Sequence, residues 1–181
     1  MANTPLWVFG YGSLMWNPGF AFDERAIARL DGFSRSFCMR SIHHRGTPEV
    51  PGLVLALDPV AGASCEGIVL RVKSGSEDDT IEYLRKRELV SSAYVELSQR
   101  VELNDGRQVE AVTFVVDTDH VQYCGDLPLE EQAGIIARSV GGRGPNTEYL
   151  YNTAEHLAEL GIRDAELDWL ARRVREIEAG L

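Results

Sequence analysis

The sequence predicts an α+β fold, a small, mostly antiparallel barrel or curled sheet with helices packed around it. Strand-like apolar patterns dominate the first two-thirds of the chain, whereas helical spacing dominates the last third. Asn104-Asp105-Gly106 lies between two strand patterns and is a strong signal for a tight hairpin. Strands gathered ahead of helices are typical of α+β folds rather than of alternating α/β folds.

The strand patterns are short apolar runs or runs in which apolar and polar residues alternate. Ile68, Leu70 and Val72 alternate most clearly, as expected for a half-buried strand. The expected strands cover residues 6–11, 32–40, 50–57, 66–72, 94–103 and 109–116.

Helical patterns appear once in the middle of the chain and then throughout its last third. Serines and acidic residues before residue 78 can cap the first helix, and Leu167, Leu170, Val174 and Ile177 form one apolar stripe on the last. The expected helices cover residues 78–90, 128–140, 146–160 and 164–178. Because the chain has no linker, repeat or low-complexity segment, we expect residues 1–181 to form a single domain.

Composition narrows the class of partner and the compartment. The formal net charge of −10 argues against nucleic-acid binding and makes anionic membranes poor partners. The sequence also has neither an apolar run long enough to span a bilayer nor the layout of a signal peptide. Three widely spaced cysteines suit a reducing environment. We therefore expect a cytoplasmic protein, with no prediction of its oligomeric state.

The first candidate site is the turn that follows the first strand, Gly10-Tyr11-Gly12-Ser13-Leu14. Two glycines around Tyr11 allow a sharp turn whose successive amide N–H groups point at a carboxylate or a developing oxyanion. The alternative is a simple strand-ending bend, since a lone Gly-x-Gly motif is weakly specific.

The second candidate is Glu88, which follows Ile81 and Leu84 on one stripe of the expected helix. Burial of a carboxyl raises its pKa towards neutrality, as a general base requires. In the alternative, Leu89 takes the core position and Glu88 pairs with Arg85 or Arg87 on the surface.

Other motifs are less specific. Arg45, in an irregular loop, is available to a substrate carboxylate or to a surface ion pair. The glycine-rich residues 141–146 are best interpreted as a helix stop followed by a helix start, after which Tyr149 helps to build one wall of a pocket. The histidine and cysteine spacings favour no metal site, and Cys38 and Cys65 are expected in the core.

Taken together, these segments resemble the ChaC-type γ-glutamylcyclotransferases, which act on glutathione. The N-terminal match is Phe9-Gly-Tyr-Gly-Ser-Leu-Met-Trp16, and a second is His44-Arg-Gly-Thr-Pro-Glu49. The remaining matches, in the family's order, are Tyr83-Leu84 and Arg87-Glu88 followed by Tyr94, then Tyr123 and Gly125, and residues 144–152. Residues 89–93 depart from the family's pattern, and the last helix extends beyond it.

The resemblance implies a γ-glutamylcyclotransferase-like barrel with peripheral helices. It implies that Tyr11, Gly12, Ser13 and Leu14 hold the γ-glutamyl group and that Glu88 is the acid/base. The implied reaction splits a γ-glutamyl peptide, expected here to be glutathione, into 5-oxoproline and the freed amine, Cys-Gly, with no metal or cofactor.

We further expect Arg45, Tyr94 and Tyr149 to contact the substrate. A cyclotransferase for other γ-glutamyl amines and a non-catalytic γ-glutamyl-binding module are the alternatives.

Overall fold

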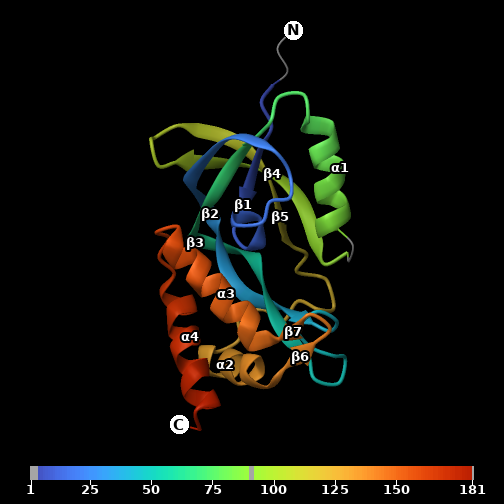
Figure 1. The fold of residues 1–181 in the computed structure, drawn as a ribbon, viewed down its shortest axis with the longest axis vertical. Coiled ribbons are helices and arrows are strands. Elements are labelled where there is room, and N and C mark those ends of the chain that lie inside the picture. Colours follow the sequence, from blue (N-terminus) through green and yellow to red (C-terminus); the bar gives the residue numbers. More distant parts are fainter. Residues whose placement is uncertain (1–3, 90–91, 181) are drawn as a thin grey trace. The chain divides into compact units, whose positions relative to one another are not determined.

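The computed structural model describes residues 4–89 and 92–180, and five of its strands close into a barrel (Figure 1). The strand order is β1-β3-β2-β4-β5, with β1 antiparallel to β3 and parallel to β5. The β2–β4 and β4–β5 pairs are antiparallel. The predicted mostly antiparallel barrel is therefore confirmed. Its strands are β1 (Trp7–Gly10), β2 (Phe22–Ser41), β3 (Gly52–Val72), β4 (Tyr94–Leu103) and β5 (Gln108–Val116).

Two strands are much longer than the sequence predicts. β2 begins at Phe22 rather than near residue 32, and the expected strands 50–57 and 66–72 are one continuous strand, β3. The start of β2, residues 22–25, is mostly exposed and polar, and only a short alternating run, Ala26, Ala28 and Leu30, follows it. In β3, Pro59 and Gly62 resemble a turn but lie in an exposed middle segment. Pairing with neighbouring strands, rather than local pattern, determines these boundaries.

The hairpin between β4 and β5 is confirmed at the predicted place. Leu103 N–H donates to Arg107 O at 2.8 Å, and Gly106 N–H donates to Leu103 O at 3.0 Å. Gly106 has a φ of 90°, in the left-handed region that favours glycine. The local turn chemistry is therefore sufficient to predict this hairpin.

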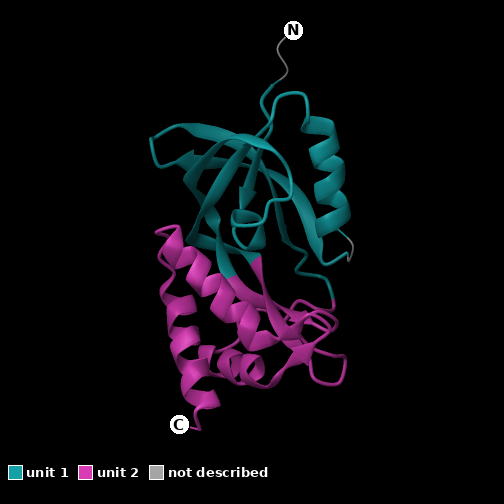
Figure 2. Ribbon diagram, viewed as in Figure 1, with its two compact units in different colours: residues 1–35, 57–120 teal, residues 36–56, 121–181 magenta. Residues whose placement is uncertain are grey.

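The chain divides into two compact units, coloured in Figure 2. Unit 1 comprises residues 1–35 and 57–120, and unit 2 comprises residues 36–56 and 121–181. The long strands β2 and β3 contribute residues to both units. The expectation of a single domain over residues 1–181 stays a prediction.

Unit 1 holds β1, β4 and β5 with the short 3-10 helix η1 (Ser13–Met15) and the helix α1 (Glu77–Glu88). The expected end of α1 at Val90 lies outside the described residues. One core cluster of unit 1 contains Trp7, Phe9 and Val69, and a second contains Leu14, Leu84 and Phe114. Burying each large apolar side chain stabilises the folded state by about 1.5–3 kcal/mol. The second cluster ties the turn after β1 to α1.

Unit 2 holds the helices of the last third, which contact one another pairwise. Asp164 caps the last helix by accepting a hydrogen bond from Leu167 N–H at 3.0 Å. On its predicted stripe Leu167, Leu170 and Val174 are buried and Ile177 is half-buried. No helix within residues 4–89 and 92–180 is both long and apolar enough to cross a membrane. The elements are α2 (Leu129–Arg138), β6 (Val140–Gly141), β7 (Gly144–Pro145), α3 (Asn146–Glu159) and α4 (Ala165–Glu178).

Asn146, the first residue of α3, joins this helix to β3 within unit 2. Its side chain is fully buried; Oδ1 accepts from Leu53 N–H at 2.8 Å and Nδ2 donates to Leu53 O at 2.9 Å. The backbone N–H of Asn146 donates to Ser139 O at 2.9 Å. The glycine-rich segment before it is a short hairpin between two helices, which confirms the predicted stop and start.

We predict that Asn146→Ala lowers the free energy of unfolding by about 2–4 kcal/mol, because it leaves two buried backbone groups of Leu53 unpaired. Asn152→Ala, at an exposed position of the same helix, is the matched control. Urea unfolding of both variants measures the difference. Equal stabilities would contradict the structural role of Asn146.

Candidate functional site

The turn after β1 presents three consecutive backbone donors. Met15 N–H donates to Gly12 O at 2.9 Å, and Asn17 N–H donates to Ser13 O at 2.8 Å, which closes η1. The amides of Gly12, Ser13 and Leu14 find no hydrogen-bond acceptor in the part of the chain that the structure describes. Successive free N–H groups of this kind make an anion-binding concavity.

The two glycines of the turn serve different purposes. A Cβ on Gly10 would lie 2.9 Å from Leu14 Cβ, so Gly10 permits the close approach of the turn to β1. A Cβ on Gly12 would meet nothing within 4 Å among the described residues. Packing therefore requires Gly10 to lack a side chain, whereas Gly12 leaves open space beside the donors.

Arg35 of β2, which is not among the predicted site residues, holds the start of the turn. Its guanidinium is buried, and Nε donates to Tyr11 O at 2.8 Å while Nη2 donates to Glu66 O. Period-two alternation with the buried Phe33 and Phe37 was the available signal, because it places Arg35 on the same inward face.

Glu88, the last residue of α1, is only 20% exposed at its side chain. Burial raises the pKa of this carboxyl above its ordinary value, and the Arg87 charge partly opposes that shift. Arg87 Nε lies 3.4 Å from Glu88 Oε1, whereas Arg85 binds Glu96 instead. Glu88 thus combines the two interpretations left open by the sequence: it is largely withdrawn from solvent and also paired with Arg87.

Arg87 connects the Glu88 carboxyl to the turn. Nη2 donates to Ser13 Oγ at 3.0 Å, and Nη1 donates to Asn17 O at 2.7 Å and to Pro18 O at 3.1 Å. The predicted site residues Ser13 and Glu88 are therefore both held by one guanidinium. The sequence offered Arg87 as an ion-pair partner of Glu88 and as part of the Arg87-Glu88 match, but it did not predict the bonds to the turn.

Tyr94, which is expected to contact the substrate, begins β4. It packs, partly buried, against the apolar cluster that includes Leu14 and Leu84, and Leu89 packs there too. Tyr11 packs against the other cluster, which contains Trp7 and Phe9. Within unit 1, Leu14 and Tyr94 therefore share one cluster.

The predicted residues Arg45 and Tyr149 both belong to unit 2 and contact each other. The Arg45 guanidinium lies 5.7 Å from the centre of the Tyr149 ring. Arg45 Nη1 also donates to Pro145 O at 3.1 Å and lies 3.9 Å from Glu148 Oε2. The ion pair that the sequence offered as an alternative for Arg45 is therefore present. Tyr149 Oη accepts from Leu55 N–H at 3.1 Å, which ties α3 to β3.

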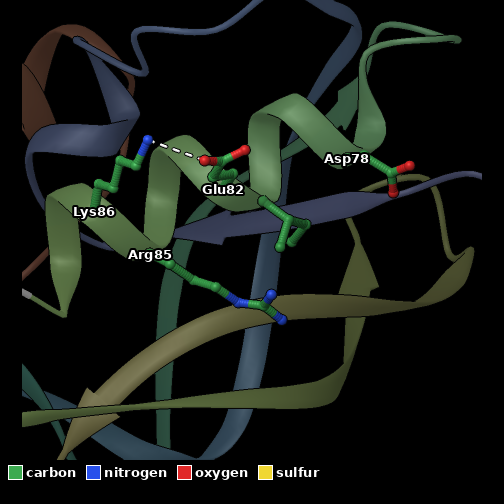
Figure 3. A pocket seen from close by; sticks show the side chains of 5 residues that line it. Asp78, Glu82, Arg85 and Lys86 are labelled. Carbon is green, nitrogen blue, oxygen red and sulfur yellow. Dashed lines mark ion pairs between the residues drawn. The ribbon is translucent and has the colours of Figure 1, made fainter.

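A surface hollow lies on α1 (Figure 3). Asp78, Ile81, Glu82, Arg85 and Lys86 line it, and Lys86 Nζ pairs with Glu82 Oε1 at 3.0 Å. None of the predicted site residues lines this hollow. No group of three or more histidine, cysteine, aspartate or glutamate side chains in residues 4–89 and 92–180 is arranged to hold a metal ion.

The raised pKa of Glu88 predicts a stability effect with a definite sign. The folded state favours the protonated carboxyl, so this group's contribution to stability is present below its ordinary pKa of 4.5 and is lost as pH rises through the raised value. We expect Glu88→Gln to unfold at higher urea concentration than wild type at pH 7, with the difference shrinking towards pH 4.

Glu82→Gln, at an exposed position of α1, is the control and should show no such pH-dependent gain. A Glu88→Gln protein that is less stable than wild type at pH 7 would show that the ionised carboxyl stabilises the fold.

Comparison with known proteins gives a consistent family assignment. A glutathione-specific γ-glutamylcyclotransferase of Escherichia coli K12 is 36% identical over 175 residues, covering 97% of this chain and 75% of the relative. γ-Glutamylcyclotransferase 2-1 of Arabidopsis thaliana is 37% identical over 178 residues, covering 94% and 82% of the two chains.

Among solved structures, a yeast γ-glutamylcyclotransferase described as specific to glutathione superposes with a TM-score of 0.85 at 25% identity, covering 99% of both chains. The model of the ChaC-like protein family matches residues 6–177, which span both units. The chain therefore belongs to the ChaC-like protein family.

Proposed function

We propose that this protein is a γ-glutamylcyclotransferase that cleaves glutathione into 5-oxoproline and Cys-Gly. The observation that carries the proposal is the link, through Arg87, between the half-buried carboxyl of Glu88 and the turn whose three amides have no acceptor among the described residues. An acid/base and a set of oxyanion donors are the two elements that this chemistry needs from a protein. The similarity to glutathione-specific relatives supports the choice of substrate.

The substrate supplies its own nucleophile. The α-amine of the γ-glutamyl residue attacks the γ-carbonyl carbon, a five-membered lactam forms, and the amide bond to the cysteine nitrogen breaks. No water is consumed. Intramolecular attack in a favourable geometry reaches effective molarities of about 10⁵–10⁸ M, so correct positioning of the substrate supplies much of the rate.

Glu88 is proposed to move the proton. The resting ammonium group of the substrate cannot attack until it is deprotonated, and the departing cysteine amine must receive a proton. A carboxyl whose pKa is raised by burial is a stronger base than an ordinary glutamate, and it keeps the proton it has taken up to a higher pH, so that it can return that proton to the leaving amine. One group can therefore perform both transfers in sequence.

The amides of Gly12, Ser13 and Leu14 are proposed to stabilise negative charge. These three successive donors can bind the oxyanion that develops on the γ-carbonyl or the substrate's α-carboxylate. Tyr11 and Tyr94 are proposed to border the γ-glutamyl group.

The assignment of Arg45 and Tyr149 to substrate binding stays a prediction, as do a single domain over residues 1–181 and a cytoplasmic location. Within unit 2, both side chains also have structural contacts of their own. Substitutions at either position therefore need a stability measurement beside the kinetic one.

Incubation with reduced glutathione in H₂¹⁸O tests the reaction class. Cyclisation yields 5-oxoproline and Cys-Gly with no ¹⁸O in the lactam carbonyl, because that oxygen comes from the substrate; mass spectrometry measures both products. Glutamate carrying ¹⁸O would instead show hydrolysis. Turnover of other γ-glutamyl amines but not of glutathione would support the alternative substrate class, and binding without turnover would support the binding module.

A further inference from the structure

We infer that Arg87 is a positioning residue that holds the Glu88 carboxylate and the turn of residues 11–14 in one fixed arrangement. The inference rests on the proposed function, since it concerns the geometry of the proposed acid/base and oxyanion donors. It assigns to Arg87 no contact with substrate and no proton transfer.

All three guanidinium nitrogens of Arg87 have partners. Nε faces Glu88 Oε1 at 3.4 Å, and Nη2 donates to Ser13 Oγ at 3.0 Å. Nη1 faces Asn17 O, Pro18 O and Tyr83 Oη at 2.7, 3.1 and 3.2 Å. The planar guanidinium can make these contacts together, with the two N–H groups of Nη1 shared among its three acceptors, whereas a lysine ammonium is a single point charge on a flexible chain.

The partners of Arg87 lie at both ends of η1. Ser13 begins this short helix, and Asn17 and Pro18 follow it. Asn17 N–H also donates back to Ser13 O at 2.8 Å, so the bonds from Arg87 secure a closed turn rather than a loose segment. A shift of this turn relative to α1 would break several of these bonds at once.

The surroundings of Arg87 distinguish it from an ordinary surface ion pair. Its side chain is 21% exposed, whereas that of Arg85, two residues earlier, is 56% exposed. Arg85 binds Glu96 through two hydrogen bonds and contacts neither the turn nor Glu88. Exposed ion pairs of that kind contribute little to the free energy of unfolding. Arg85 is therefore a matched control on the same helix.

Substitutions can separate the effect of the positive charge of Arg87 from the effect of the hydrogen bonds that its planar guanidinium makes. Arg87→Gln removes the positive charge that opposes the burial-induced rise in the pKa of Glu88, so this pKa should rise further. Arg87→Lys keeps the charge but loses most of the bonds to the turn. Arg85→Gln should change neither the ionisation of Glu88 nor the turn.

The experiment combines kinetics with two measurements that need no turnover. In all three variants we would measure kcat/KM for glutathione against pH, the NMR titration of the Glu88 carboxyl carbon, and hydrogen exchange of the Met15 and Asn17 amides. For Arg87→Gln we expect the acid limb of the kcat/KM profile and the NMR titration of Glu88 to move together to higher pH. For Arg87→Lys we expect at least about a tenfold loss of kcat and faster amide exchange, with the Glu88 titration nearly unchanged.

An unchanged Glu88 titration in Arg87→Gln, or wild-type exchange and kcat in Arg87→Lys, would overturn the inference. If Arg87→Gln does not fold, the Arg87→Lys measurements decide. If wild type does not act on glutathione, the proposed function fails, and the titration and exchange measurements still decide whether Arg87 holds Glu88 and the turn.

Discussion

The turn after β1 must bury its apolar side chains while leaving backbone donors free, and the rest of unit 1 is arranged around that constraint. Leu14 and Met15 are buried, so the turn is anchored to the core, yet the amides of residues 12–14 find no acceptor among the described residues. An unpaired amide normally lowers stability when it is shielded from water. Arg35 and Arg87 offset this by bonding the turn's other polar groups. The donors are thus available to an anion without loss of local order.

A second compromise concerns the carboxyl at the end of α1. Burial makes Glu88 a stronger base, but it also disfavours the ionised form that a base requires. The adjacent Arg87 charge moderates this effect, so Glu88 is neither an ordinary surface carboxylate nor an unpaired buried charge. Pairs of this kind are frequent at functional sites, where stability is given up for reactivity.

The sequence predicted the fold better than its element boundaries. The hairpin at residues 104–106 and the stripe of α4 follow local rules, and both are present. The polar start of β2 and the exposed middle of β3 show little apolar alternation, so pairing with neighbouring strands defines these segments. Among candidate site residues, glycine spacing and an inward helix position pointed to the turn and to Glu88. The bonds of Arg35 and Arg87 depend on tertiary contacts between residues far apart in the sequence, which no local pattern encodes.

The most direct test of the account is the rate of 5-oxoproline formation from glutathione by Glu88→Gln, measured beside its affinity for glutathione by calorimetry. If Glu88 carries the proton, the variant binds glutathione as wild type does but forms product about 10²–10⁴-fold more slowly. A folded variant that retained the wild-type rate would contradict the central claim and move the acid/base role to another group.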